Sequence, residues 1–197
     1  LVTSNEVQLR SFGELDRKKV AREAAEAAGR GWLGFDDKPP YSMLLVDELR
    51  EAAAAIRSRV GAIERSREHL KAEIERYAED ARRAEETLRR MQEAVDRAID
   101  APERARATWR RDLAQMRLRA VASRMATTQV FQQIQEEEVL ARQAELALLE
   151  RKIDSAKRDA TFNAADLAKA KLRLAAIAAN VRAEQKSLPE RLAARET

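Results

Sequence analysis

Long stretches without helix-breaking residues are the feature that most constrains the fold of this chain. Residues 103–188 contain no glycine or proline, and residues 42–100 contain one glycine, Gly61. Because glycine and proline most often interrupt or end helices, both stretches predict long helices. Apart from Gly13, the remaining breakers fall at three places: residues 29–40, Pro102 and Pro189.

The first long stretch carries a heptad pattern. Steps of three and four residues reach twelve positions, of which only Arg67 is polar, which predicts the seam of a coiled coil. These positions are Val60, Ile63, Arg67, Leu70, Ile74, Tyr77, Ala81, Ala84, Leu88, Met91, Val95 and Ala98. Upstream the seam reads Leu45, Leu49, Ala52 and Ile56. Val60 then follows four residues later where three are due, which predicts a stutter.

The second stretch predicts one helix over residues 103–188 with two registers. The first register runs Trp109, Leu113, Met116, Ala120, Ser123, Thr127, Val130, Ile134, Glu137, Ala141, Ala144 and Leu148. The second begins at Leu149, Ile153, Ala156 and Ala160 and continues to Leu188. We interpret the change as a phase slip near residue 148.

A turn near residues 100–103 predicts an antiparallel hairpin, because a short connection makes helices neighbours. Residue i then faces residue 203 − i, and the stutter faces the slip. A further helix, from about Ser4 to Ala28, is expected to pack on residues 162–188. The sequence thus predicts an all-α fold: residues 1–41 as helix and linker, 42–188 as an elongated antiparallel coiled-coil hairpin, and 189–197 as a C-terminal tail.

Composition supports this class. The chain has 197 residues, with 45% hydrophobic, 37% charged and 4% aromatic residues and no cysteine, which is typical of long helices and coiled coils. The absence of cysteine excludes disulfides and thiolate metal sites. No apolar run reaches the roughly 20 residues of a membrane span, and no signal peptide opens the chain. Since it starts at Leu1, we expect it to be part of a longer protein.

Residues for catalysis are scarce. His69 is the single histidine, and we interpret it as a surface residue of a helix. No phosphate-binding glycine loop, dinucleotide fingerprint or zinc-protease motif is present. Acidic groups such as residues 85–86 and 136–138 are expected to pair with Arg and Lys. We therefore predict no catalytic residue, no metal site and no cofactor.

The most uneven charge follows the turn. Residues 103–124 hold seven arginines and two acids, a net charge of +5. One interpretation is an interaction tip that contacts anionic lipid headgroups or another anionic polymer. In the other, Trp109 lies on the seam and residues 79–100, with a net charge of −2, cancel much of the excess. The candidate tip residues are Arg104, Arg106, Trp109, Arg110 and Arg111.

The linker before the first long stretch carries three of the eight aromatic residues. We expect Trp32, Phe35 and Tyr41, with Pro39 and Pro40, to dock the linker onto the helices; an ordinary structured turn is the alternative. Ser42 is expected to cap the long helix that follows.

Two segments carry a family resemblance: GWLGFDDKPPYSMLLVDELREAAAAIRSRVGAIE at residues 31–64 and FNAADLAKAKLRLAAIAANV at residues 162–181. Together they resemble the N-terminal extracytoplasmic coiled-coil region of large MscS-like (small-conductance) mechanosensitive channels. The resemblance covers residues 31–192 and implies a non-catalytic periplasmic module at the bacterial inner membrane. It supplies no catalytic residues.

The leading hypothesis is therefore a structural and interaction domain of such a channel, supporting assembly, envelope contact or gating. The expected partners are other channel subunits, its membrane-embedded part, and anionic lipid or other envelope components; homo-oligomers fit this role. One alternative is a peripheral membrane-binding or remodelling coiled coil that uses the arginine-rich tip. Another is a cytoplasmic coiled coil associated with nucleic acid, which the interleaved charges disfavour.

Overall fold

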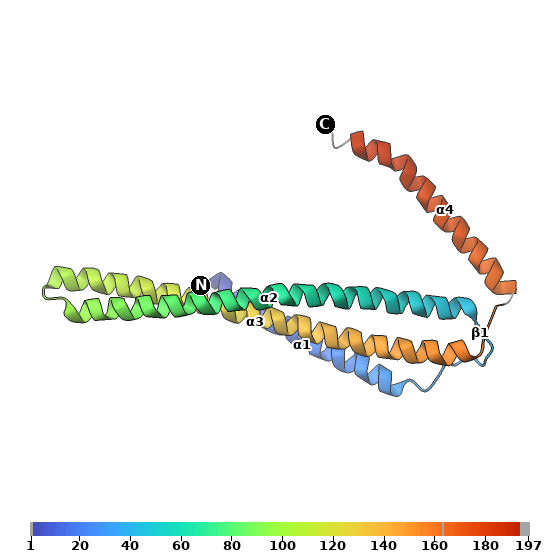
Figure 1. Ribbon diagram of the computed structural model, residues 1–197, viewed down its shortest axis with the longest axis horizontal. Coiled ribbons are helices and arrows are strands. Elements are labelled where there is room, and N and C mark those ends of the chain that lie inside the picture. Colours follow the sequence, from blue (N-terminus) through green and yellow to red (C-terminus); the bar gives the residue numbers. More distant parts are fainter. Residues whose placement is uncertain (1, 163, 194–197) are drawn as a thin grey trace. The chain divides into compact units, whose positions relative to one another are not determined.

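The computed structural model describes residues 2–162 and 164–193, and in this part of the chain it contains four helices and two very short strands. The helices are α1 (Val2–Gly31), α2 (Met43–Arg97), α3 (Ala101–Arg158) and α4 (Ala164–Ala193). The strands are β1 (Tyr41–Ser42) and β2 (Ala160–Thr161), which pair in parallel. The predicted all-α class is confirmed (Figure 1).

Helices α2 and α3 form an antiparallel hairpin that turns over residues 98–100 (Figure 1). The backbone N–H of Glu103 donates to Asp100 Oδ1 at 2.7 Å, and the N–H of Ile99 donates to Glu103 Oε2 at 3.2 Å. These reciprocal bonds resemble a capping box, which satisfies free N–H groups at a helix start. The turn therefore lies where Pro102 and its neighbours predicted it.

The seam of α2 is confirmed from Val60 to Ala98, since every predicted position is buried or half-buried. The prediction of a stutter between Ile56 and Val60 is wrong. Val46 and Ala53 are 1% and 0% exposed, whereas Ala52 is exposed. With Leu49 and Ile56 half-buried, the same alternation of three and four residues continues without interruption. The prediction followed Leu45 because it is large and apolar, but the packing selected Val46.

The seam of α3 differs from the predicted one over residues 109–148 and agrees with it from Leu149 onward. Buried and half-buried residues recur at alternating steps of three and four, beginning at Ala107, which is buried, and reaching Ala160. They are Ala107, Arg111, Ala114, Leu118, Val121, Met125, Thr128, Gln132, Gln135, Val139, Arg142, Leu146, Leu149, Ile153, Ala156 and Ala160. The predicted register from Leu149 belongs to this seam, so no phase slip is needed. Trp109, Leu113 and Met116 lie outside it and are exposed.

The facing residues agree with the predicted hairpin register. Arg67 pairs with Glu136 at 3.8 Å. Nearer the turn, Leu88 and Gln115 line one shallow groove between the helices. Residue i therefore faces a residue close to 203 − i, as expected from a turn at residues 100–103.

The chain divides into two compact units. Unit 1 comprises α1, Trp32 and the parts of α2 and α3 between residues 56 and 147. Unit 2 comprises residues 33–55 and the chain from Leu148 onward, including the strands and α4.

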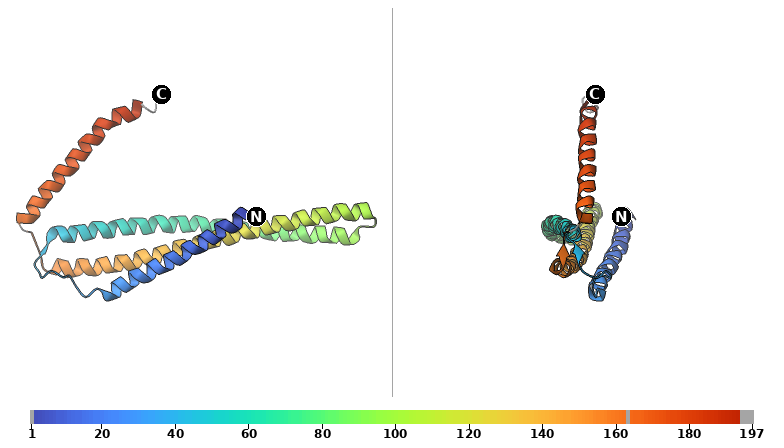
Figure 2. Two further views of the ribbon diagram at one scale, coloured as in Figure 1. Left: turned by 180° about the vertical axis from the view of Figure 1, so that it is seen from behind. Right: turned by 90° about the vertical axis from the view of Figure 1, so that its right-hand side faces the viewer.

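Within unit 1, α1 packs on α3 (Figure 2). Leu15 forms a buried cluster with Val130 and Ile134, and Ser11 and Thr128 are also buried. Lys18 and Arg22 further along α1 pair with Glu138 and Glu137, so the two helices run in the same direction. The predicted packing of the N-terminal helix on residues 162–188 is therefore wrong. The apolar stripe of α3 was predicted to face α2. At Val130 and Ile134 it is instead the surface on which α1 packs.

Within unit 2, the predicted single helix over residues 103–188 is interrupted. Helix α3 ends at Arg158, β2 follows at residues 160–161, and α4 begins at Ala164. The N–H of Tyr41 donates to the carbonyl oxygen of Asp159 at 3.0 Å, and β1 pairs with β2. Because these bonds come from a segment about 120 residues away in sequence, no local glycine or proline marks the break. Helix α4 also continues past Pro189 to Ala193, so Pro189 does not end it; residues 194–197 of the predicted tail lie outside the described residues.

Candidate interaction surfaces

The middle of the hairpin is polar on its inner side. Gln135 Nε2 donates to Ser66 Oγ at 2.9 Å, and Arg67 and Gln132 line one open groove there. The Nε of Arg67 is buried, and its side chain keeps only 30% exposure while it pairs with Glu136. An arginine on a heptad seam can extend its aliphatic stem outward so that the guanidinium reaches solvent. The structure instead places it against polar seam residues of α3.

The acidic run at residues 136–138 lies where α1, α2 and α3 meet. Glu137 Oε2 is 3.1 Å from Arg22 Nη1 on α1. Glu138 pairs with Lys18 on α1 at 3.0 Å and with Arg59 on α2 at 3.4 Å. The run was predicted to pair with basic residues, and this is confirmed. The run therefore links both α1 and α2 to α3.

The carboxyl group of Glu138 shows how this cluster balances burial against charge. Burial by itself raises its pKa. The hydrogen bond and positive charge of Lys18, joined by those of Arg59, outweigh burial and hold the pKa of Glu138 below its ordinary value. The ionised carboxylate is therefore the form that the folded chain favours.

The predicted tip residues are divided between two sides of α3. Arg104 donates to the carbonyl oxygen of Ala98 at 3.1 Å and so caps the end of α2. Arg111 is half-buried, pairs with Asp112 and lines a groove with Leu88 of α2. Arg106, Trp109 and Arg110 are exposed. The tip set is therefore not one contiguous cluster.

The expected cancellation of charge across the hairpin does not take the form of ion pairs. Acidic residues of α2 near the turn pair with arginines one turn away on the same helix, namely Glu79 with Arg83, Glu86 with Arg90 and Glu93 with Arg97. Among the residues that the structure describes, no carboxylate lies within ion-pair distance of Arg106, Arg110 or Arg117. The positive charge of the α3 tip therefore stays available to a partner.

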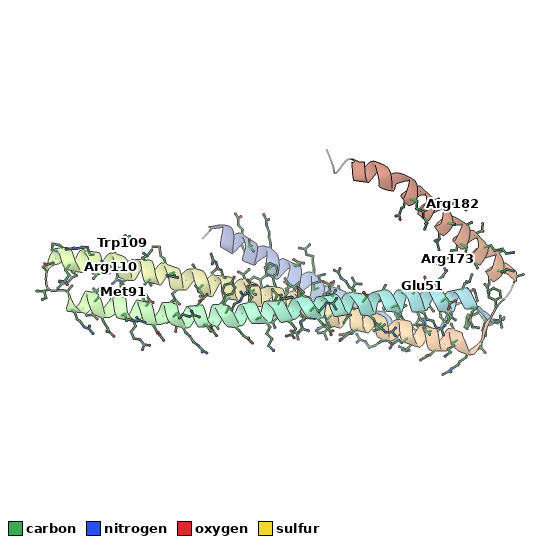
Figure 3. All side chains as sticks on the ribbon, turned by 45° about the horizontal axis from the view of Figure 1, so that its top comes forward. Glu51, Met91, Trp109, Arg110, Arg173 and Arg182 are labelled. Carbon is green, nitrogen blue, oxygen red and sulfur yellow. The ribbon has the colours of Figure 1, made fainter. Side chains whose placement is uncertain are left out.

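The exposed apolar residues of the tip lie on the outer side of α3. Trp109 is 67% exposed, and Leu113 and Met116 are about half exposed. Ala107 and Ala114 face α2, and Trp109 lies about 200° around the helix from Ala107. Figure 3 shows Trp109 and Arg110 on α3, with Met91 on the neighbouring α2. Ile99 in the turn itself is 92% exposed.

The linker residues form a small cluster of their own in unit 2. The rings of Phe35 and Tyr41 lie 5.0 Å apart between centroids, tilted by 51°. Both residues are half-buried, whereas Pro39 and Pro40, joined by a cis peptide bond, are exposed. Trp32, also half-buried, belongs to unit 1. Of the three aromatic residues predicted to dock the linker, Trp32 therefore lies in unit 1, and Phe35 and Tyr41 lie in unit 2.

A joint follows the linker, made by Tyr41, Ser42, Glu48, Asp166 and Arg173. Ser42 Oγ accepts from the N–H of Leu44 at 3.1 Å and donates to Asp166 Oδ1 at 2.6 Å. Ser42 therefore caps α2, as predicted, and also holds the first turn of α4. Asp166 is only 2% exposed, and Arg173 pairs with Glu48 at 3.3 Å. Asp166 is absent from the residues predicted from the sequence, although an acid in the first turn of a helix is a recognisable signal of a helix start.

His69 is exposed on α2, as expected. Within residues 2–162 and 164–193, no group of three or more His, Cys, Asp or Glu side chains is arranged to hold a metal ion. None of the helices in this part of the chain is both long enough and apolar enough to cross a membrane.

Comparison with family models, curated proteins and solved structures finds no match to this chain.

Proposed function

We propose that this chain is a structural and interaction module without catalytic activity, and that it forms an extracytoplasmic helical part of an MscS-like mechanosensitive channel. The fold supports the first part of the proposal, a structural module. Two helices of more than 50 residues each pair along a continuous seam. Such a hairpin is a stiff scaffold, because bending it disturbs many heptad contacts at once.

One observation favours the second part of the proposal, that the chain belongs to an MscS-like channel. The two segments that resemble the channel region, residues 31–64 and 162–181, are about 100 residues apart in sequence, yet they meet in the joint. β1 and Ser42 come from the first segment, and Asp166 and Arg173 from the second. The residues that carry the resemblance therefore lie together in one structural element.

In this function the joint ties three helix ends together. The Ser42 hydroxyl group bridges the start of α2 and the first turn of α4, while Tyr41 holds the end of α3. We propose that the joint transmits displacement of α4 to the ends of α2 and α3, and that the helices present surfaces to neighbouring subunits and to other envelope components. No cofactor takes part in this function.

The reading frame that continues after Thr197 tests the channel proposal. It is expected to encode several segments of about 20 apolar residues, the length of a membrane span. A stop codon within a few tens of codons, with no such segment, would overturn it.

Labelling from outside the inner membrane tests the location separately. In the full-length protein, cysteine at exposed Ala122 is expected to react with a membrane-impermeant maleimide in spheroplasts. Cysteine at the buried Ala53 serves as the unreactive control. Labelling of Ala122→Cys only after lysis would place the module in the cytoplasm and contradict the proposal.

A further inference from the structure

We propose that the end of the hairpin is a docking face for a membrane surface rich in anionic phospholipid. The docking face consists of four apolar residues, Ile99, Trp109, Leu113 and Met116, and three basic residues, Arg106, Arg110 and Arg117. The proposal does not depend on the channel function, because it rests on the exposed surface of the turn and of α3.

The apolar part of the face continues a surface that already binds a helix. Val130 and Ile134, further along the same stripe of α3, are buried by Leu15 of α1. Trp109, Leu113 and Met116 continue this stripe toward the turn. None of the described residues covers them in the way that α1 covers Val130 and Ile134. The stripe is therefore suited to burial, and close to the turn it is exposed to solvent.

The basic part of the face follows one edge of the stripe. Residues 106, 110 and 117 are spaced by four and seven residues, so they lie on one side of the helix. Among the nearby acidic side chains, Asp100 and Glu103 form capping bonds and Asp112 pairs with Arg111. Asp80 lines a groove with Arg117 but forms no ion pair with it. The edge therefore carries positive charge beside an apolar surface.

This combination favours a lipid surface over a second copy of the chain. Two tips packed stripe to stripe with their helices antiparallel bring their arginine edges together, and like charges at close range repel. A membrane interface offers anionic headgroups to the arginines and an apolar layer to the side chains below them. Tryptophan suits such an interface because its ring is apolar and its N–H remains hydrated. Arginine can bury its aliphatic stem while its guanidinium stays at the headgroups.

Vesicle co-sedimentation of the 197-residue chain tests the proposal. We expect binding to vesicles of phosphatidylcholine with 30% phosphatidylglycerol, and weak binding to phosphatidylcholine alone. The double variant Arg106→Glu/Arg110→Glu is expected to bind the anionic vesicles at least tenfold more weakly. The matched control Arg76→Glu/Arg82→Glu changes net charge equally at exposed positions of α2 and is expected to retain binding.

Tryptophan fluorescence tests the apolar part of the face. The chain contains two tryptophans, so Trp32→Phe leaves Trp109 as the reporter. Its emission is expected to shift to shorter wavelength when anionic vesicles are added. The reverse variant, Trp109→Phe, is expected to show no such shift.

Three outcomes would overturn the proposal. One is equal binding by the Arg106→Glu/Arg110→Glu variant and its matched control. Another is an unchanged emission of Trp109 on anionic vesicles. The third is concentration-dependent self-association without lipid that is lost in Trp109→Ala, which would identify a second copy as the partner.

Discussion

At the scale of single residues, one carboxylate connects three helices. Glu138 lies on α3 and forms ion pairs with Lys18 of α1 and Arg59 of α2. Surface ion pairs usually contribute little, because water and salt screen them. Glu138 differs from most pairs here because its side chain is only 15% exposed and it has two basic partners. Charge-assisted hydrogen bonds of this kind are stronger than neutral ones.

Replacing Glu138 by Gln is expected to lower the free energy of unfolding by about 1–2 kcal/mol at pH 7. The lowered pKa of Glu138 gives the effect a pH dependence. Its contribution is fully present above the unfolded-state pKa, near 4.5, and is lost as the pH falls through the lower folded-state value. Urea unfolding at pH 7 and at pH 3 is therefore expected to show a smaller difference between the two proteins at pH 3.

The matched control is Glu79→Gln, which removes an exposed pair with Arg83 on the same helix. Its effect is expected to stay within about 0.5 kcal/mol at pH 7. An equal effect of both variants, or a Glu138→Gln effect that does not change with pH, would contradict the assigned role.

At the scale of helices, α3 carries two stripes with different partners. The stripe facing α2 includes polar residues such as Thr128, Gln132 and Gln135, whereas the outer stripe includes Val130 and Ile134. Hydrophobic periodicity detects the more apolar stripe, which here belongs to the α1 interface and its exposed continuation. The seam of α3 that faces α2 was therefore not predicted from hydrophobic periodicity, because it contains several polar residues.

Truncating Leu15 to Ala tests the assignment of the outer stripe. It leaves a cavity in the cluster with Val130 and Ile134, for a loss of about 2–3 kcal/mol. Hydrogen exchange followed by mass spectrometry is expected to show faster exchange in α1, with α2 and the tip half of α3 unchanged. The control is Leu9→Ala, since Leu9 is largely exposed. Loss of protection centred on α2 instead would show that α1 is not the partner of this stripe.

At the scale of the whole molecule, the hairpin is held together by contacts repeated along its two helices rather than by a large hydrophobic core. Many of the buried residues are alanines, including Ala84, Ala107 and Ala114. Small side chains let the helix axes approach closely. The apolar area per contact is then modest, and stability comes from repetition along the helices.

The register predicts a cross-link within one chain. Ala84 and Val121 line the same groove between α2 and α3, and the natural chain has no cysteine. The variant Ala84→Cys/Val121→Cys, treated with a short bis-maleimide at low protein concentration, is expected to give mainly a cross-linked monomer on denaturing gels. Each single-cysteine variant is the control for intermolecular products. Exclusively dimeric products from the double variant would indicate pairing between chains.

The helical class, the turn beside Pro102, the seam of α2 from Val60 to Ala98 and the register of the hairpin could all be predicted from the sequence. These follow from local signals: breakers, capping residues and a heptad repeat that only Arg67 interrupts. Packing between distant segments sets which stripe of α3 faces α2, where α1 docks and where α3 ends. Those choices depend on contacts between residues far apart in sequence, such as Leu15 with Val130 and Tyr41 with Asp159. The energy of such contacts is shared between two segments, so neither segment alone carries a signal for it.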